Sequence, residues 1–119
     1  LEPRGNFIQQ FYSFNIKDNK KSISVISGFI ENAQKEGNRY DHFLNLLAYK
    51  YMAEGNLELA KSTFEKCINV YKNGYNPYDS MGEYYLKKGD STLAKEYYLK
   101  AIEKYPFARN ASKVLGTLN

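Results

Sequence analysis

The fold is decided by residues 75–108, which read YNPYDSMGEYYLKKGDSTLAKEYYLKAIEKYPFA. Apolar residues recur there at helical spacing, first over residues 78–85 and again over residues 93–102. Gly89 separates the two patterns and has the backbone freedom that a tight turn needs. Pro106 closes the segment, because proline cannot continue a helix. The segment therefore predicts two helices joined by a short turn.

Capping signals stand at the start of both predicted helices. We expect Asn76 to cap the first helix, because the proline that follows it, Pro77, suits a first helical turn. Asp90 or Ser91 can cap the second helix.

Small residues predict where the two helices touch. Gly82 and Ala94 lie on the facing surfaces, where short side chains let the backbones approach. Tyr85 and Tyr98 are expected to fill the space above and below this contact. A larger side chain at either small position should lower the thermal midpoint, because a packed site tolerates extra volume poorly.

The same pattern occurs 34 residues earlier, in residues 41–74. Aligning Ala60 with Ala94 also pairs Gly55 with Gly89, so both segments have a turn glycine in the same place. Large residues pair with large ones and small residues with small ones. Repetition at this period indicates an array of helical repeats.

The repeated positions resemble the tetratricopeptide repeat, a helix–turn–helix unit of the same period. The resemblance rests on Leu47, Ala48, Tyr51, Gly55, Ala60 and Phe64 in the first segment and on Tyr78, Gly82, Tyr85, Gly89, Ala94, Tyr98, Ala101 and Pro106 in the second. It implies an all-α fold in which the repeats form a short right-handed superhelix. It also implies a non-catalytic interaction or scaffolding module that binds a peptide or protein partner.

Extending the period in both directions divides the whole chain. We expect a loop over residues 1–6, a degenerate helix pair over 7–40, repeats over 41–74 and 75–108, and a capping helix over 109–119. Within this pair, Phe7 and Phe11 mark a first helix, and Ile26, Ile30 and Ala33 mark a second one. The pair is either a degenerate repeat or a helical linker from a segment upstream. A repeat array needs such atypical elements at its ends, and the sum is about seven helices.

Composition excludes several classes of protein. The 119 residues suffice for one domain with a modest core. The net charge of +4 is spread along the chain, whereas nucleic-acid-binding proteins gather basic residues on one face. No apolar run is long enough to span a membrane. Residues 1–20 lack a signal-peptide pattern, and the sequence leaves the cytoplasm and the periplasm open as compartments.

Motifs for catalysis and cofactor binding are missing from the sequence. It has no nucleophile elbow, phosphate-binding loop or zinc-protease motif. His42, the only histidine, has no obvious nucleophile, so we interpret it as a helix-start residue facing a groove or solvent. Cys67, the only cysteine, is interpreted as a small buried hydrophobe. The sequence predicts no enzyme activity, no cofactor and no metal site in this chain.

Tyrosine is unusually frequent, with 12 residues. Four take apolar positions of the repeats and are expected in the core: Tyr51, Tyr78, Tyr85 and Tyr98. Three fit the core less easily: Tyr49, Tyr84 and Tyr97. These three could line a groove, pack between adjacent repeats or lie half-exposed.

Candidate partner-binding residues follow if the first helix of each repeat lines the inner surface, as the resemblance implies. They are His42, Asn45, Tyr49 and Met52 in the first repeat and Asn76, Asp79, Glu83 and Lys87 in the second. Family members that clamp a peptide's C-terminal carboxylate use basic and amide side chains at such places. Asp79 and Glu83 do not suit that role. The same surface could instead pack against the N-terminal helices or an attached domain.

Residues 76–85, NPYDSMGEYY, also resemble repeats appended to the C-terminus of bacterial serine hydrolases. That resemblance implies an alternative function, in which the chain is a structural or accessory domain of a larger, esterase-like hydrolase. The catalytic domain upstream in the same polypeptide would then be the partner. Self-association through exposed helix edges is a further hypothesis, and the sequence leaves the oligomeric state open.

Overall fold

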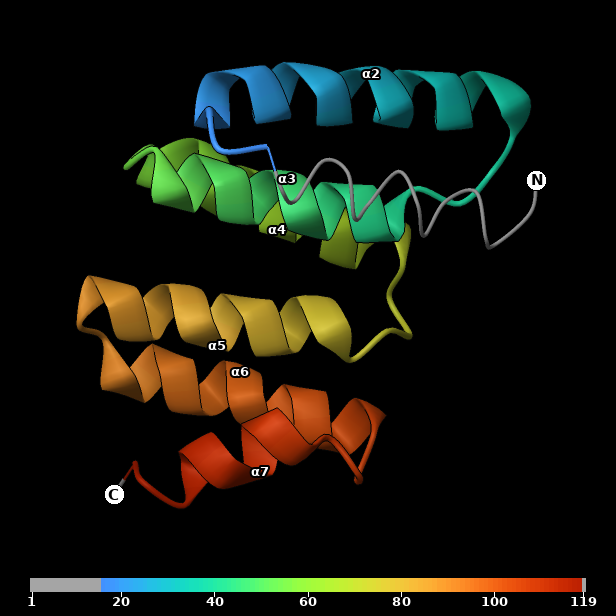
Figure 1. Cartoon of the computed structure of the whole chain (residues 1–119). Coiled ribbons are helices and arrows are strands. Elements are labelled where there is room, and N and C mark those ends of the chain that lie inside the picture. The colour runs from blue at the N-terminus through green and yellow to red at the C-terminus, as the bar shows by residue number, and fades with distance from the viewer. Residues whose placement is uncertain (1–15, 119) are drawn as a thin grey trace. The chain divides into compact units, whose positions relative to one another are not determined.

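The computed structural model describes residues 16–118 of the chain (Figure 1). Within that range it contains six helices and no strand, which confirms the predicted all-α fold there. The helices are α2 (Asn19–Glu36), α3 (Asp41–Ala53), α4 (Leu57–Val70), α5 (Asn76–Lys88), α6 (Ser91–Lys104) and α7 (Arg109–Leu115). The loop expected over residues 1–6 and the helix expected around Phe7 and Phe11 lie outside the described residues. The superhelical stacking of the repeats stays a prediction.

The chain forms two compact units, Leu1–Thr63 and Phe64–Asn119, and the boundary between them falls within α4. In the first unit, α2 packs against α3. The apolar stripe of α2 is buried at Ile26, Ile30 and Ala33. The ring of Phe29 lies 5.5 Å from the ring of Phe43 on α3, measured between centroids. Helical spacing in the sequence predicted this buried stripe.

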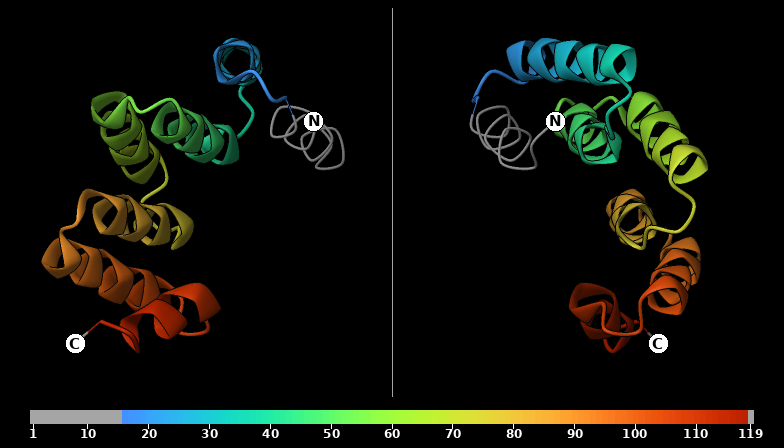
Figure 2. Two further views of the ribbon diagram at one scale, coloured as in Figure 1. Left: turned by 60° about the vertical axis from the view of Figure 1, so that its left-hand side comes forward. Right: turned by 90° about the vertical axis from the view of Figure 1, so that its right-hand side faces the viewer.

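In the second unit, α5 and α6 lie side by side, and α7 lies next to α6 (Figure 2). Their shared core is built from small residues and one aromatic ring: Ala94, Tyr98, Ala101, Ala108 and Ala111. Tyr78 and Tyr85 of α5 are half-buried and pack against this core. Two of the core alanines belong to the start of α7, so the core extends to the last helix.

A close approach between α5 and α6 occurs at Gly82. A β-carbon at this position would lie 2.7 Å from two carbons of the Tyr98 ring, nearer than real side chains pack. Tyr98 is 1% exposed, so its ring has no free space into which it could turn. Ala94, the small residue expected opposite Gly82, is fully buried on α6. The spacing of these two helices therefore requires glycine at position 82.

Tyr84 is a core residue that packs between consecutive repeats. Its side chain is 2% exposed, and its ring meets the ring of Phe64 on α4 edge-on, at 6.5 Å between centroids. Tyr85 contacts it from the other side at 5.0 Å. The sequence left three environments open for Tyr84, and the structure shows the one in which it packs between adjacent repeats.

The turns within the repeats use glycine in the left-handed conformation. Gly55 has φ 85° and Gly89 has φ 83°, a region that other residues seldom adopt. The carboxylate of Asp90 accepts a hydrogen bond from the Leu93 N–H at 3.0 Å, which confirms Asp90 as the cap of α6. Asn56, at the equivalent place before α4, accepts the Leu59 N–H at 3.2 Å.

Asn76 does not cap α5, so that prediction is wrong. The N-cap is Tyr75, whose side chain makes no capping bond, and Asn76 is the first helical residue. Pro77 then takes the second helical position, which suits proline equally because the first N–H groups of a helix have no partner within it. The helix consequently starts one residue earlier than the proline alone indicates.

Replacing Gly82 with alanine should lower the free energy of unfolding by about 1 kcal/mol or more, because the new β-carbon overlaps the buried Tyr98 ring. Gly28→Ala is the matched control, since nothing lies within 4 Å of a β-carbon at that position in α2. It should leave stability unchanged or raise it by about 0.5–1 kcal/mol. Urea unfolding followed by circular dichroism measures both. An unchanged midpoint for Gly82→Ala would contradict the close approach.

The Asp90→Ala substitution should destabilise the protein by about 1 kcal/mol, because the Leu93 N–H loses its only capping acceptor. Asp90→Asn keeps an oxygen in the same place and should retain most of the stability. Thermal unfolding of the two variants makes the comparison. Equal losses would mean that the charge of Asp90, rather than its capping bond, matters.

Candidate functional site

The four candidate residues of the second repeat lie along one side of α5, as their spacing of three and four residues requires. Asn76, Glu83 and Lys87 are exposed, and Asp79 is half-buried. Three of the four side chains on this side of α5 are therefore in contact with solvent.

The first repeat differs at one candidate position. His42, Asn45 and Tyr49 are half-buried on α3. Met52 is only 6% exposed, so the expectation that it faces a partner is wrong. It follows Leu44 and Ala48 at intervals of four residues, and these two are also buried, so Met52 continues their core stripe.

A pocket of about 400 Å³ opens in the second unit, where α5 and α7 begin. We call it the α5–α7 pocket; its lining includes Tyr75, Asp79, Tyr105, Phe107, Arg109 and Asn110. Asp79 is the one predicted candidate with a side chain half-buried in it, and Asn76 lies at its edge. The pocket thus joins part of the predicted site to residues from the loop after α6.

Asp79 and Asn110 connect α5 to α7. The side-chain amide of Asn110 donates to both carboxylate oxygens of Asp79, at 2.9 and 3.0 Å. Burial raises the pKa of Asp79, and the Asn110 amide only partly opposes this effect. Among the residues that the structure describes, no cation forms an ion pair with this carboxylate.

The carboxylates of Asp79 and Glu83 also affect the ionisation of Tyr98 in the core. Burial raises the pKa of the Tyr98 hydroxyl well above its ordinary value, and the carboxylates of Asp79 and Glu83 raise it further. Tyr98 is therefore a neutral packing residue at any physiological pH.

Three aromatic residues form one edge of the pocket. The rings of Tyr75 and Tyr105 lie 5.0 Å apart, and those of Tyr105 and Phe107 lie 5.8 Å apart, between centroids. All three are exposed, and Phe107 reaches 77%. A row of exposed rings beside a half-buried carboxylate combines apolar contact area with charge.

Sequence reasoning did not select the aromatic edge or Asn110. Asn110 lies 34 residues after Asn76, so the repeat period could have identified it if the last segment had been considered more than a cap. The aromatic residues flank Pro106 and the start of α5, outside the positions that helical spacing selects. Their proximity depends on the path of the loop, which the helical pattern does not encode.

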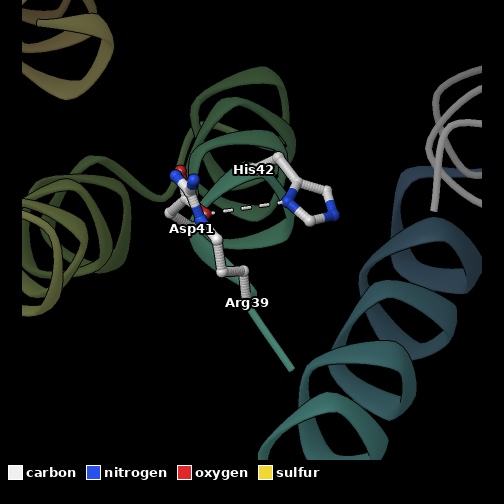
Figure 3. Close-up of polar contacts among 3 residues, drawn as sticks. All are labelled: Arg39, Asp41 and His42. Atoms are coloured by element: carbon white, nitrogen blue, oxygen red, sulfur yellow. Dashed lines mark hydrogen bonds and ion pairs between the residues drawn. The ribbon is translucent and has the colours of Figure 1, made fainter. Parts of the chain in front are cut away.

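A second polar cluster lies at the start of α3, in the first unit (Figure 3). Arg39 donates two hydrogen bonds to the carboxylate of Asp41, from Nε at 3.2 Å and from a terminal nitrogen at 2.9 Å. His42 Nδ1 stands 3.8 Å from the same carboxylate, which is longer than a hydrogen bond. His42 Nε2 is buried, with no hydrogen-bond partner among the described residues. This nitrogen therefore does not face solvent, one of the two environments expected for His42, and the other, a groove, stays a prediction.

The charge of Asp41 is held in place by its neighbours. Partial burial alone would raise the pKa of Asp41, but His42 and Arg39 outweigh that effect and lower the pKa to about 2. We attribute most of the lowering to Arg39, because its two contacts are short and its charge is permanent. The cluster stabilises the first turn of α3, where a negative charge also favours the helix.

None of the helices in residues 16–118 is long and apolar enough to cross a membrane. In the same part of the chain, no group of three or more histidine, cysteine or acidic residues is placed to hold a metal ion. Cys67 is buried.

The tetratricopeptide repeat family model matches residues 41–73 and 75–106, which is more than half of the chain. The chain therefore belongs to the tetratricopeptide repeat family. Repeats of this family mediate protein–protein interaction and are typically non-catalytic. No curated protein sequence matches the chain.

Stability should decrease as the pH falls from the ordinary aspartate value of 3.8 towards 2, because the folded protein holds the Asp41 proton more weakly than the unfolded chain does. Arg39→Gln should reduce this loss, since it raises the folded-state pKa of Asp41. Urea midpoints measured at about pH 5 and about pH 2.5 give the difference. Asp41→Asn, which cannot titrate, is the control, and an unchanged acid sensitivity in both variants would contradict the assignment.

Proposed function

We propose that this chain is a non-catalytic interaction module that binds a peptide or protein partner along α5 and in the α5–α7 pocket. Family membership supports the general role, since tetratricopeptide repeats mediate protein–protein interaction. The observation that carries the proposal is the row of exposed rings at Tyr75, Tyr105 and Phe107, next to the half-buried Asp79. Interfaces gain most of their energy from such aromatic anchors.

The accessible polar residues of α5 support the same assignment. Asn76, Glu83 and Lys87 are exposed on the side of the helix that carries Asp79. Together with the aromatic edge they provide a polar rim around an apolar anchor, which is the usual composition of a protein interface. The family's typical lack of catalysis agrees with a role in binding.

Site-specific photo-cross-linking tests this proposal. A photoreactive benzoylphenylalanine in place of Phe107 should cross-link a partner in extract of the source cells, because the ring points into the proposed interface. Leu99 is the matched control position, since it is 51% exposed on α6 and does not line the pocket. Mass spectrometry of the product identifies the partner.

The outcomes of the cross-linking separate the hypotheses. A product from position 107 but not from position 99 supports the proposal. Equal products from both positions would show unspecific contact and contradict it. A product with twice the mass of the chain would indicate self-association in place of a different partner.

A catalytic domain in the same polypeptide is a second candidate partner, proposed from the likeness of residues 76–85 to the tails of bacterial serine hydrolases. An antibody raised against this chain measures the size of the native polypeptide on a blot. A band much larger than 13.8 kDa supports this candidate. A band at the mass of the chain itself rules it out.

A further inference from the structure

The α5–α7 pocket contains a carboxylate, Asp79, that forms no ion pair with a cation among the residues that the structure describes. Asp79 is half-buried, and within residues 16–118 its oxygens accept hydrogen bonds only from the neutral amide of Asn110. A carboxylate that loses water without gaining a cation is destabilised in its charged form. The raised pKa of Asp79 agrees with this cause. A cationic ligand would restore the stabilisation of the charged carboxylate that burial has removed.

The aromatic edge of the pocket also favours a positively charged ligand. Ring faces carry negative electrostatic potential and attract ammonium and guanidinium groups. The second unit already uses tyrosine faces in this way, since Lys100 Nζ lies 4.9 Å from the Tyr97 ring centroid and Lys104 Nζ lies 5.7 Å from that of Tyr78. Tyr105 and Phe107 offer further exposed rings beside Asp79.

Two further charges lie near the pocket and act in opposite directions. Glu83 is exposed one helical turn after Asp79 and adds negative potential to this side of α5. Arg109 lines the pocket and adds positive charge. Arg109 is itself exposed, so water already stabilises its charge, whereas the Asp79 carboxylate has lost part of its hydration. A ligand of opposite charge would therefore stabilise the Asp79 carboxylate more than it would stabilise Arg109.

We infer that the α5–α7 pocket binds a lysine or arginine side chain of the partner, with the cation at Asp79 and the apolar stem across Tyr105 and Phe107. This inference rests on the proposed function, because it names the chemistry of the partner that the module binds. A long basic side chain matches both halves of the pocket, since its stem is apolar and its end is charged.

Defined peptides test the inference on the whole chain. The probes are acetylated and amidated pentapeptides that differ only in the central residue, which is arginine, lysine or glutamate. Each is titrated into the ¹⁵N-labelled protein and followed by NMR. The arginine and lysine peptides should shift the backbone signals of residues 75–79 and 105–110. They should also shift the side-chain amide of Asn110, because it donates to the carboxylate that receives the cation.

Charge and aromatic variants then separate the two halves of the pocket. Asp79→Asn should weaken binding of the arginine peptide about fivefold. Glu96→Gln is an equal change of charge at an exposed position on α6 and should leave the affinity unchanged. Phe107→Ala should weaken it about threefold, with Leu99→Ala as the control. Phe107 is so exposed that its loss cannot unfold the protein, which keeps the test valid if Asp79→Asn is unstable.

Two results would overturn the inference. One is preferential binding of the glutamate peptide, lost in Arg109→Gln, which would assign an acidic partner to the pocket. The other is the absence of shifts at residues 75–79 and 105–110 with all three peptides. In either case, cross-linking from position 107 decides separately whether the chain is an interaction module, so the two proposals fail independently.

Discussion

The missing β-carbon at Gly82 is the constraint on which the second unit depends. It lets the Tyr98 ring lie directly against the backbone of α5, and this contact sets the distance between α5 and α6. Asp79 precedes Gly82 by one helical turn, and Tyr105 directly follows α6, so the same spacing brings the carboxylate and the aromatic edge to one pocket. The core and the candidate site are therefore parts of one packing arrangement.

Two aspartates in the first turns of repeat helices show how strongly the surroundings of a carboxylate change its pKa. Asp41 of α3 receives two hydrogen bonds from the guanidinium of Arg39, and its pKa falls. Asp79 of α5 receives, from the described part of the chain, hydrogen bonds only from a neutral amide, and burial raises its pKa. Two carboxylates in the first turns of their helices thus have pKa values shifted in opposite directions. The carboxylate with a permanent partner stabilises the fold, and the one without a cation is suited to an external ligand.

The sequence predicts what depends on local spacing and little of what depends on loops. The α-helices, the turn glycine at position 89 and the Asp90 cap follow from residues adjacent in the chain, and the structure agrees with each. Met52 was assigned to a surface because spacing cannot show which of two faces of a mainly apolar helix is covered. Asn110 was missed because its contact with Asp79 joins two residues that are 31 positions apart in the chain and lie on different helices. Such contacts follow from how α6 ends and how α7 is docked, which a periodic pattern does not specify.

The shortness of α7 has a consequence for any ligand in the pocket. A helix of seven residues does not persist alone in water, so α7 is folded only while Ala108 and Ala111 stay in the core. Detachment of α7 would remove Arg109 and Asn110 from the pocket. The apparent affinity for a ligand is then the intrinsic affinity reduced by the fraction of molecules in which α7 is detached. Any change that stabilises the docked α7 therefore tightens binding without contacting the ligand, and a bound ligand in turn lowers the population of molecules in which α7 is detached.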